Sequence, residues 1–250
     1  MAFDMVAPPD LEAAISGANK AATEISITVD IPKIRLESLK EAALGYGVRS
    51  GLARRSYEIS KILYDNQALL DNVFNFNAML LEKSVIPPVL SEAQNSLKQP
   101  NSDTIRIADA TYRVERQAAF VTAPPNWRDY LVRDYKYKVD LPADLLLPKG
   151  DNEKKLWQQY VVQGWDTGVT QANAIFEQSL ARLERDFKGM ILYRSLLAKG
   201  MIGKPYVAES NLGVTGDGNA MSVNDRVLRI TDKPKLETNP AAWSPMATPK

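Results

Sequence analysis

Two carboxylates near the middle of the chain, Asp129 and Asp134, are the first residues whose type suggests catalysis. A pair of acidic side chains can act as general acid and general base in glycoside hydrolysis when both face one bond. These two are five positions apart, so they align poorly on one helix face, and each follows an arginine, Arg128 or Arg133. The spacing therefore favours ion pairs over a catalytic pair.

A glycine-rich stretch farther along the chain contains Gly213, Gly216 and Gly218. Glycines at similar spacings cradle phosphates when their loop opens a helix and a Lys-Ser or Lys-Thr pair follows. No such pair follows here, and the residues after the loop have the pattern of a strand. The stretch therefore predicts the turn of a β-hairpin.

The same stretch offers Asp217, Asn219 and Asp225 as possible oxygen ligands for calcium. An EF-hand loop needs a fixed ligand spacing and a closing glutamate, and this sequence provides neither. We interpret the three residues as parts of the turn. No catalytic, cofactor-binding or metal-binding residue is predicted.

The sequence contains neither histidine nor cysteine. This excludes thiol catalysis, disulfides, thiolate or histidine metal sites and Ser-His-Asp triads, because each needs a missing side chain. Carboxylates, lysine, tyrosine and Mg²⁺ remain for chemistry. The 31 basic residues balance 30 acidic ones, and a net charge of +1 gives no overall attraction to nucleic acid or to an anionic membrane. Binding to a polyanion would need a local basic patch.

Large aromatic residues beside glycines form a cluster of another kind. Gly164 and Gly168 share a helix face, where a missing side chain lets another backbone or a Trp ring approach closely. This indicates close packing, either inside the protein or against another subunit. The candidate packing or interface residues are Trp157, Gly164, Trp165, Gly168, Trp127 and Tyr130.

Most of these residues lie in the longest run without proline, at positions 149–204. Apolar residues recur three or four apart through this run, which predicts a helix. Asp151 is placed to cap its start, and Glu153 suits the positive end of the helix dipole. One helix of about 45–50 residues would extend for ~70 Å, so we expect two successive helices with a break near Gly189.

A second run without proline covers residues 33–83. Three glycines loosen its first part, so the firm helix is expected to begin at about Arg49. Apolar residues then follow at the spacing of a coiled coil. Two interpretations stay open, an amphipathic helix packed on its own domain and a seam for another chain. The spaced residues are Leu52, Ile59, Leu63, Leu70, Val73 and Leu80.

Alternation of apolar and polar residues, which is typical of strands, begins in the middle of the chain. Residues 104–107 and 111–115 alternate on either side of 108–110, which predicts a central β-hairpin turning at 108–110. Residues 84–103 are expected to form a turn, a short helix and a loop. Beyond the central hairpin, residues 126–135 are expected to contain a short helix.

The alternation returns at residues 206–208 and 223–230, around the glycine-rich turn. We therefore predict an α+β protein with two long helical segments, a central β-hairpin and a C-terminal antiparallel β-hairpin. Its expected organisation is a mobile N-terminal leader at 1–32, a single α+β domain at 33–231 and an extended proline-rich tail at 232–250.

Several blocks of the sequence, from about Glu37 to Trp243, resemble one family in the same order and with similar gaps. This family is DotC, the lipoprotein of type IVB secretion systems, which include the Dot/Icm apparatus and IncI-type conjugation machinery. The blocks are FNAMLLE (76–82) with IPPVL (86–90), IRIADATY (105–112), QAAF (117–120) with PPNWRDYL (124–131), LLPK (146–149), GWDTGVTQAN (164–173), DFKGMILYR (186–194) and LGVTGDG (212–218) leading to DRVLRIT (225–231).

The resemblance implies a structural subunit of the outer-membrane core complex with no enzymatic activity and no cofactor. Its implied partners are a DotD-like lipoprotein, a DotH-like outer-membrane component, further core-complex subunits and copies of itself in a ring. Direct binding to nucleic acid is not expected. The near-zero charge and the long helical faces agree with such a scaffold.

Precursors in this family carry a signal peptide and a lipobox cysteine, and residues 1–10 provide neither. Those residues alone fit either a cytoplasmic protein or a mature form that begins after the lipobox. The resemblance implies a periplasm-facing location at the outer membrane, with an N-terminal lipid anchor in the native form.

Two other functions are weighed against this one. A module that binds peptidoglycan or sugars would use the aromatics Trp127, Tyr130 and Trp243. A hydrolase without histidine would use acidic residues near loops, such as Asp129, Asp134, Asp217 and Asp225.

Overall fold

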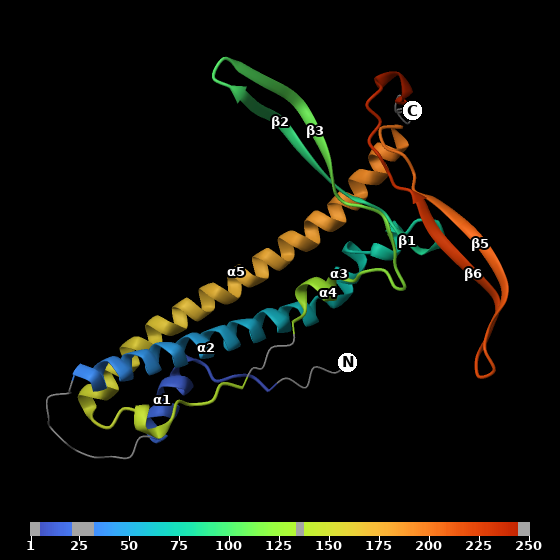
Figure 1. The fold of residues 1–250 in the computed structure, drawn as a ribbon. Coiled ribbons are helices and arrows are strands. Elements are labelled where there is room, and N and C mark those ends of the chain that lie inside the picture. Colours follow the sequence, from blue (N-terminus) through green and yellow to red (C-terminus); the bar gives the residue numbers. More distant parts are fainter. Residues whose placement is uncertain (1–5, 22–32, 134–137, 245–250) are drawn as a thin grey trace. The chain divides into compact units, whose positions relative to one another are not determined.

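Two long helices, α2 and α5, dominate the structure, a computed structural model that describes residues 6–21, 33–133 and 138–244 (Figure 1). The predicted α+β class with two long helical segments is confirmed. The helices are α1 (Leu11–Ala21), α2 (Lys33–Asp65), α3 (Gln67–Val73), α4 (Trp127–Leu131) and α5 (Asp151–Ala198). The strands are β1 (Val85–Ile86), β2 (Val89–Asn101), β3 (Thr104–Arg116), β4 (Ala119–Phe120), β5 (Tyr206–Gly216) and β6 (Met221–Asp232).

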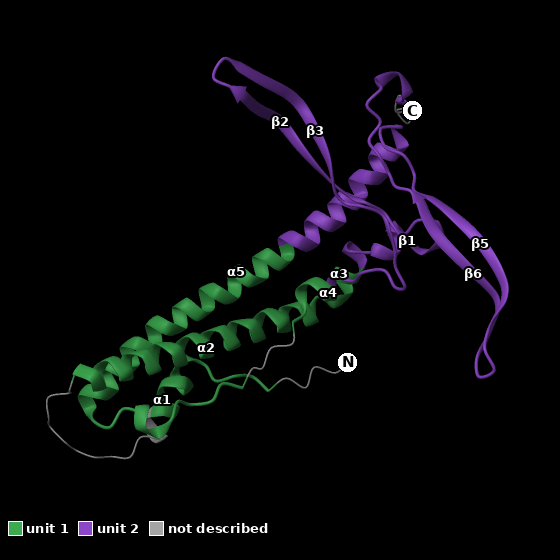
Figure 2. Ribbon diagram, viewed as in Figure 1, with its two compact units in different colours: residues 1–71, 128–180 green, residues 72–127, 181–250 purple. Residues whose placement is uncertain are grey.

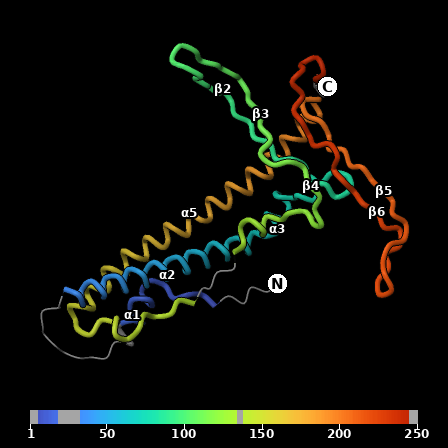
Figure 3. Tube along the Cα trace, in the orientation of Figure 1, coloured from blue at the N-terminus to red at the C-terminus, as the bar shows by residue number. Residues whose placement is uncertain are grey.

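The described strands form three sheets of two antiparallel strands, in which β1 pairs with β4, β2 with β3, and β5 with β6. The β5–β6 pair confirms the predicted C-terminal hairpin, and a central hairpin is present as β2–β3, although its strands and turn differ from those predicted. The chain trace shows β2–β3 and β5–β6 as two long ribbons (Figure 3). A two-stranded ribbon leaves both outer edges without a strand partner.

The chain divides into two compact units, unit 1 (Met1–Asp71 and Arg128–Leu180) and unit 2 (Asn72–Trp127 and Ala181–Lys250), as Figure 2 shows. The range 33–231, expected to be one domain, is thus shared between them. Residues 1–5 and 22–32 of the expected leader, and 245–250 of the expected tail, lie outside the described residues.

The core of unit 1 lies where α1, α2 and the first half of α5 meet. Trp157 is fully buried there, and its ring centre lies 6.3 Å from that of Tyr46. Ala14 and Ala18 of α1 are fully buried in the same cluster, and the Asp10 side chain caps α1 by accepting the Ala13 N–H at 2.8 Å. The buried members of this cluster are Ala14, Ala18, Leu39, Ala43, Tyr46, Leu147, Trp157 and Val161.

Helix α2 begins at Lys33, so the prediction that its firm part starts near Arg49 is wrong. Glycine lowers helix propensity when a helix is isolated, but Gly47 and Gly51 are buried at the contact with α5. Tertiary packing therefore stabilises the segment whose local propensity is weak.

The core of unit 2 surrounds the start of β2 and the end of α5. Leu90 of β2 is buried with Tyr193 and Leu196 of α5 and with Ile202. Beside this cluster, the Phe187 ring contacts Phe74 and Phe76 edge-on, with centroid separations of 5.4 and 5.2 Å. Edge-to-face contacts are favourable because the positive ring edge meets a negative ring face.

Helix α5 is continuous over 48 residues, so the predicted break near Gly189 is wrong. Gly189 is a contact site instead: a Cβ there would lie 2.6 Å from the Leu90 carbonyl oxygen of β2. One turn earlier, the buried Asp186 carboxylate pairs with Arg116 at 2.9 Å and with Arg185 at 3.0 Å. These contacts hold the base of the β2–β3 ribbon on the helix.

The turn of the central hairpin lies at 102–103, so the predicted turn at 108–110 is wrong. Residues 104–116 form one uninterrupted strand, and the expected helix and loop at 84–103 are β1 and β2. The Asn101 side chain accepts the Asp103 N–H at 3.2 Å, which closes the turn. The alanines at 108 and 110 interrupt the alternation of large apolar and polar residues, but they do not bend the strand.

Residues 233–244 fold back on the end of α5. The Glu237 N–H donates to the Met201 carbonyl at 2.9 Å, and the Ser244 N–H donates to the Lys199 carbonyl at 2.8 Å. Leu236 packs on the core of unit 2. The described part of the predicted tail is therefore attached to unit 2 by backbone hydrogen bonds.

Tyr193 is expected to make the stability of unit 2 depend on pH in the alkaline range. Burial raises the pKa of its hydroxyl from 10.0 to about 12. A raised pKa in the folded state gives stability that is present below pH 10.0 and is lost as the pH rises to about 12. We expect Tyr193→Phe to lose less of its free energy of unfolding over this interval than the wild type. Chemical unfolding at a series of alkaline pH values measures the two slopes, and equal slopes would contradict the assignment.

Candidate functional site

The acidic residues that suggested catalysis are engaged in structural contacts or lie apart. Asp134 lies outside the described residues, and Asp129 is exposed on α4. Arg128 pairs with Asp71 of α3 at 2.5 Å. Successive helical residues point in different directions, which is why Arg128 reaches across to α3.

The glycine-rich stretch forms the end of the β5–β6 ribbon, as predicted. The Asp217 carboxylate accepts the N–H groups of Asn219 and Ala220 at 2.8 and 3.0 Å, and these bonds hold its pKa below the usual value. Asp225 accepts the Thr215 hydroxyl at 2.5 Å across the ribbon. Both carboxylates therefore stabilise the hairpin. Within the described residues, no three Asp or Glu side chains gather closely enough to hold a metal ion.

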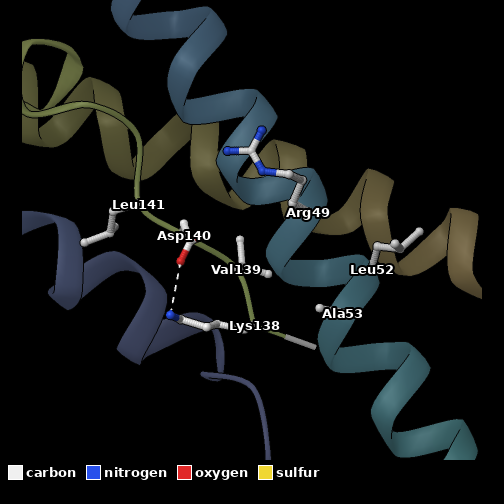
Figure 4. A pocket seen from close by; sticks show the side chains of 7 residues that line it. All are labelled: Arg49, Leu52, Ala53, Lys138, Val139, Asp140 and Leu141. Carbon is white, nitrogen blue, oxygen red and sulfur yellow. Dashed lines mark ion pairs between the residues drawn. The ribbon is translucent and has the colours of Figure 1, made fainter. Parts of the chain in front are cut away.

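A shallow cavity of about 490 Å³ lies on unit 1 between α2 and residues 138–141 (Figure 4). Lys138 and Asp140 form an exposed ion pair at its edge, with a separation of 3.6 Å. Arg49 extends from α2 on another side (Figure 4). We assign no ligand to this cavity. Its lining is Arg49, Leu52, Ala53, Lys138, Val139, Asp140 and Leu141.

The strongest packing feature of unit 1 is the close approach of α2 and α5 at two pairs of glycines, one pair on each helix. Gly47 and Gly51 of α2 meet α5, and Gly164 and Gly168 of α5 meet α2. A Cβ on any of the four would overlap a carbonyl oxygen of the opposite helix. The helices therefore approach more closely than side chains would allow. Beside this contact, the Arg55 guanidinium donates to the Asn173 side chain at 2.8 Å.

The other candidate packing residues lie at several places. Trp157 is fully buried in the core of unit 1, and Trp165 packs against that core at its edge. Trp127 is buried in its surroundings, with 2% of its surface exposed, and Tyr130 is half-buried. Stacking on a sugar needs an exposed ring face, so Trp127 is unavailable for it. The Trp243 indole donates to the Glu237 carbonyl at 3.0 Å.

The coiled-coil spacing of residues 52–80 extends over more than one element, because α2 ends at Asp65 and α3 begins at Gln67. The Asn66 side chain between them donates to the Ile62 carbonyl at 2.8 Å. Among the spaced residues, Leu63 is buried, Val73 is exposed, and Leu52, Ile59, Leu70 and Leu80 are half-buried.

The two long ribbons carry apolar side chains that the sequence analysis did not select. On β2–β3 these are Leu97, Ile105 and Ile107, which are exposed near the turn. The β5–β6 ribbon likewise exposes Leu212, Val214, Met221 and Val223 near its turn. The sequence signal for these exposed residues is the alternation of apolar and polar residues along each strand. It indicates an exposed apolar face only once it is known that each strand has a single partner.

None of the described helices is long and apolar enough to span a membrane. The main features of unit 1 and unit 2 are, respectively, the close packing of α2 on α5 and the ion-paired ribbon base with its exposed ribbons.

Comparison with protein families gives a match over residues 33–245 to a family described as type IV secretory system, conjugal DNA-protein transfer. A comparison with curated proteins gives no match. The matched range includes both long helices and both ribbons. Because the match covers most of the 250 residues, the chain belongs to this type IV secretory system family of conjugal DNA-protein transfer.

Proposed function

We propose that the protein is a structural subunit of the outer-membrane core complex of a type IVB secretion system, with the role that DotC has in such systems. The family match supports a part in type IV secretion and conjugation. The finer proposal rests on the ordered resemblance of the sequence blocks between Glu37 and Trp243 to DotC.

The observation that carries the proposal is where those blocks lie in the structure. The block at 86–90 is buried at the base of the β2–β3 ribbon. The block at 164–173 contains both α5 glycines of the contact with α2. The block at 186–194 contains buried Asp186, Met190 and Tyr193. Blocks that carry the resemblance thus lie at close-packed contacts, which is compatible with a structural role.

Assembly with other subunits accounts for the outer edges of the two long ribbons, which have no strand partner among the described residues. Each ribbon has two strands, open edges and apolar side chains near its turn. Such edges attract further strands or other covering partners. In the proposed complex the partners are a DotD-like lipoprotein, a DotH-like component and further copies of the chain. The native form would face the periplasm at the outer membrane through an N-terminal lipid.

Affinity purification of the native full-length protein from donor cells tests this role. We expect DotD-like and DotH-like proteins to copurify, and the protein to fractionate with the outer membrane. Deletion of the gene should abolish plasmid transfer. A soluble cytoplasmic protein that purifies without either partner would overturn the proposal.

A matched set of variants separates a scaffold from a hydrolase. Asp129→Asn and Asp225→Asn remove candidate catalytic carboxylates, and we expect both to restore transfer when they complement the deletion. If either variant folds normally, copurifies with both partners and still fails to restore transfer, that carboxylate has a chemical role and the non-enzymatic proposal is wrong.

A further inference from the structure

The half of the β2–β3 ribbon nearest its turn has two chemically different faces. Leu97 and Ile107 are directly opposite each other across the strands, and Ile105 is two residues from Ile107 on the same face. Their exposed fractions are 67%, 72% and 60%. Three large apolar side chains are therefore presented together to the surroundings.

The core of unit 2 does not reach this apolar face. Val89 and Leu90 at the start of β2 are buried, but Leu97 is seven residues farther along the strand. At about 3.3 Å per residue, that is ~23 Å from the buried base. Because a grouped apolar surface of this kind marks an interaction site, something outside the unit is expected to cover it.

The opposite face of the same segment is basic. Lys98 and Arg106 are directly paired across the strands. Like charges in such a pair repel each other. Neither side chain forms an ion pair with an acidic group among the described residues. An anionic partner would relieve this repulsion.

We propose that this end of the β2–β3 ribbon binds the surface of an anionic lipid bilayer. Leu97, Ile105 and Ile107 enter the boundary between headgroups and acyl chains, while Lys98 and Arg106 extend to lipid phosphates. The open strand edges remain hydrated at headgroup depth, so the ribbon need not enter the hydrocarbon region, where unpaired backbone groups are unfavourable.

A lipid surface fits the two faces better than other anionic partners do. It offers acyl chains and phosphates in adjacent layers, whereas one protein surface would have to cover both sides of a ribbon. Single-stranded nucleic acid binds through stacking on aromatic rings as well as through basic groups. Residues 96–108, which form this end of the ribbon, contain no aromatic residue.

The β5–β6 ribbon provides an internal comparison. Val214 and Val223 are directly opposite each other and exposed, but the nearest charged residue toward the turn is Asp217. The β2–β3 end also has an acidic residue in its turn, Asp103, but Lys98 and Arg106 outnumber it, whereas the β5–β6 end has Asp217 and no basic residue between Val214 and Val223. The β5–β6 end therefore lacks the basic face that would hold an anionic headgroup, and it is not expected to support binding to anionic vesicles.

Vesicle flotation with the purified chain tests the proposal. The chain contains no cysteine, so no lipobox lipid contributes to binding. We expect it to float with equimolar phosphatidylcholine and phosphatidylglycerol vesicles and to stay behind with phosphatidylcholine alone. Added salt should weaken the binding, because charge attraction at a surface is screened. Equal binding to both kinds of vesicle, or none to either, would overturn the proposal.

Paired variants locate the binding surface. Lys98→Glu with Arg106→Glu should lower vesicle partitioning by roughly tenfold or more, since each basic group contributes roughly fivefold. Leu97→Ser with Ile107→Ser should also lower it by roughly tenfold or more, because it removes apolar area that binding to the bilayer boundary depends on. The matched control, Val214→Ser with Val223→Ser, should bind like the wild type. Circular dichroism spectra identical to the wild type establish that each variant is folded.

Two outcomes contradict this assignment. If all three double variants bind vesicles equally well, the ribbon is not the lipid site. If the wild type self-associates without vesicles and Leu97→Ser with Ile107→Ser makes it monomeric, the apolar face is an interface between copies. The proposal stands apart from the ring role, which is judged by copurifying partners, so either one can fail alone.

Discussion

Gly168→Leu is expected to lower the stability of unit 1 far more than any substitution on the surface of that unit. A Cβ at position 168 would overlap the Val48 carbonyl oxygen and would lie 2.7 Å from the Leu52 amide nitrogen of α2. Both atoms belong to the backbone of a long helix, so they cannot move aside as a flexible side chain can. The two helices must separate, and the buried cluster around Trp157 loses its packing. We expect a loss of about 4 kcal/mol or more in the free energy of unfolding.

Gly45→Leu is the matched control, because Gly45 also lies within a long helix. Its nearest contact for an added Cβ is the Arg49 guanidinium at 3.7 Å, which is an ordinary separation. Leucine favours a helix by roughly 0.8 kcal/mol over glycine, so this variant should be as stable as the wild type or slightly more stable. Urea unfolding followed by circular dichroism compares the three proteins. A Gly168→Leu protein with the wild-type midpoint would show that the helices do not need this contact.

The close approach at Gly168 could be predicted from sequence only in part. Spacing places Gly164 and Gly168 on one helix face with another backbone as a possible neighbour, and the atoms beside them belong to the α2 backbone at Leu44, Val48 and Leu52. Spacing does not predict that Gly47 and Gly51 of α2 face the α5 backbone in the same way, because glycine is expected to weaken a helix. Local propensity and tertiary packing give opposite expectations there, and packing decides.

The continuity of α5 illustrates the same limit. Gly189 lies within a 48-residue helix. It does not end the helix, and it faces the backbone of the strand that packs on it. The atoms that Gly189 faces belong to Val89 and Leu90, which are about a hundred residues earlier in the chain. A contact between such distant segments leaves no local periodicity from which it can be read.

The two hairpins show what alternation does and does not determine. In the β5–β6 ribbon, glycines and Asp217 mark the turn, so pattern and turn chemistry agree. In the β2–β3 ribbon, Ser102 and Asp103 form a turn without glycine, and the pattern alone favoured a bend at the small residues 108–110. Strand length is therefore the property that was missed, and with it the exposed end of the ribbon.

The sequence limits the kinds of chemistry open to the chain, but it does not show which residues meet in the folded protein. The missing histidine and cysteine side chains removed whole classes of catalysis from consideration. The ion pairs were not predictable, because they join distant segments. Arg116 meets Asp186 across 70 positions, and Arg35 meets Glu153 across 118. From the sequence alone, Glu153 is expected only to be a favourable charge at the start of a helix.

Arg35→Met should give the largest loss of stability among substitutions of charged residues in unit 1. The guanidinium donates to both Glu153 carboxylate oxygens, at 3.0 and 2.8 Å, and to the carbonyl oxygens of Leu145 and Leu147. It thereby joins the first turn of α2, the first turn of α5 and the loop before α5. Both side chains are largely buried, with 22% and 13% exposed. Methionine fills similar space but removes the guanidinium donors, so the Glu153 carboxylate keeps the hydrogen bond from the Lys149 N–H, at 2.9 Å, and loses both of those from Arg35. We therefore expect a loss of about 2–3 kcal/mol.

The pH dependence distinguishes this ion pair from simple packing. Hydrogen bonds from Arg35 are the main cause that lowers the pKa of Glu153 from its usual 4.5. A lowered pKa gives stability that is present above pH 4.5 and is lost as the pH falls below it. The difference between wild type and Arg35→Met should therefore be largest near neutral pH and should shrink in acid. Arg35→Lys, which keeps the charge but not the planar fork, should fall between the two. Urea unfolding at a series of acidic pH values measures all three proteins, and a difference that stays constant with pH would mean that Arg35 acts through its packing and its bonds to the carbonyls, because those do not titrate.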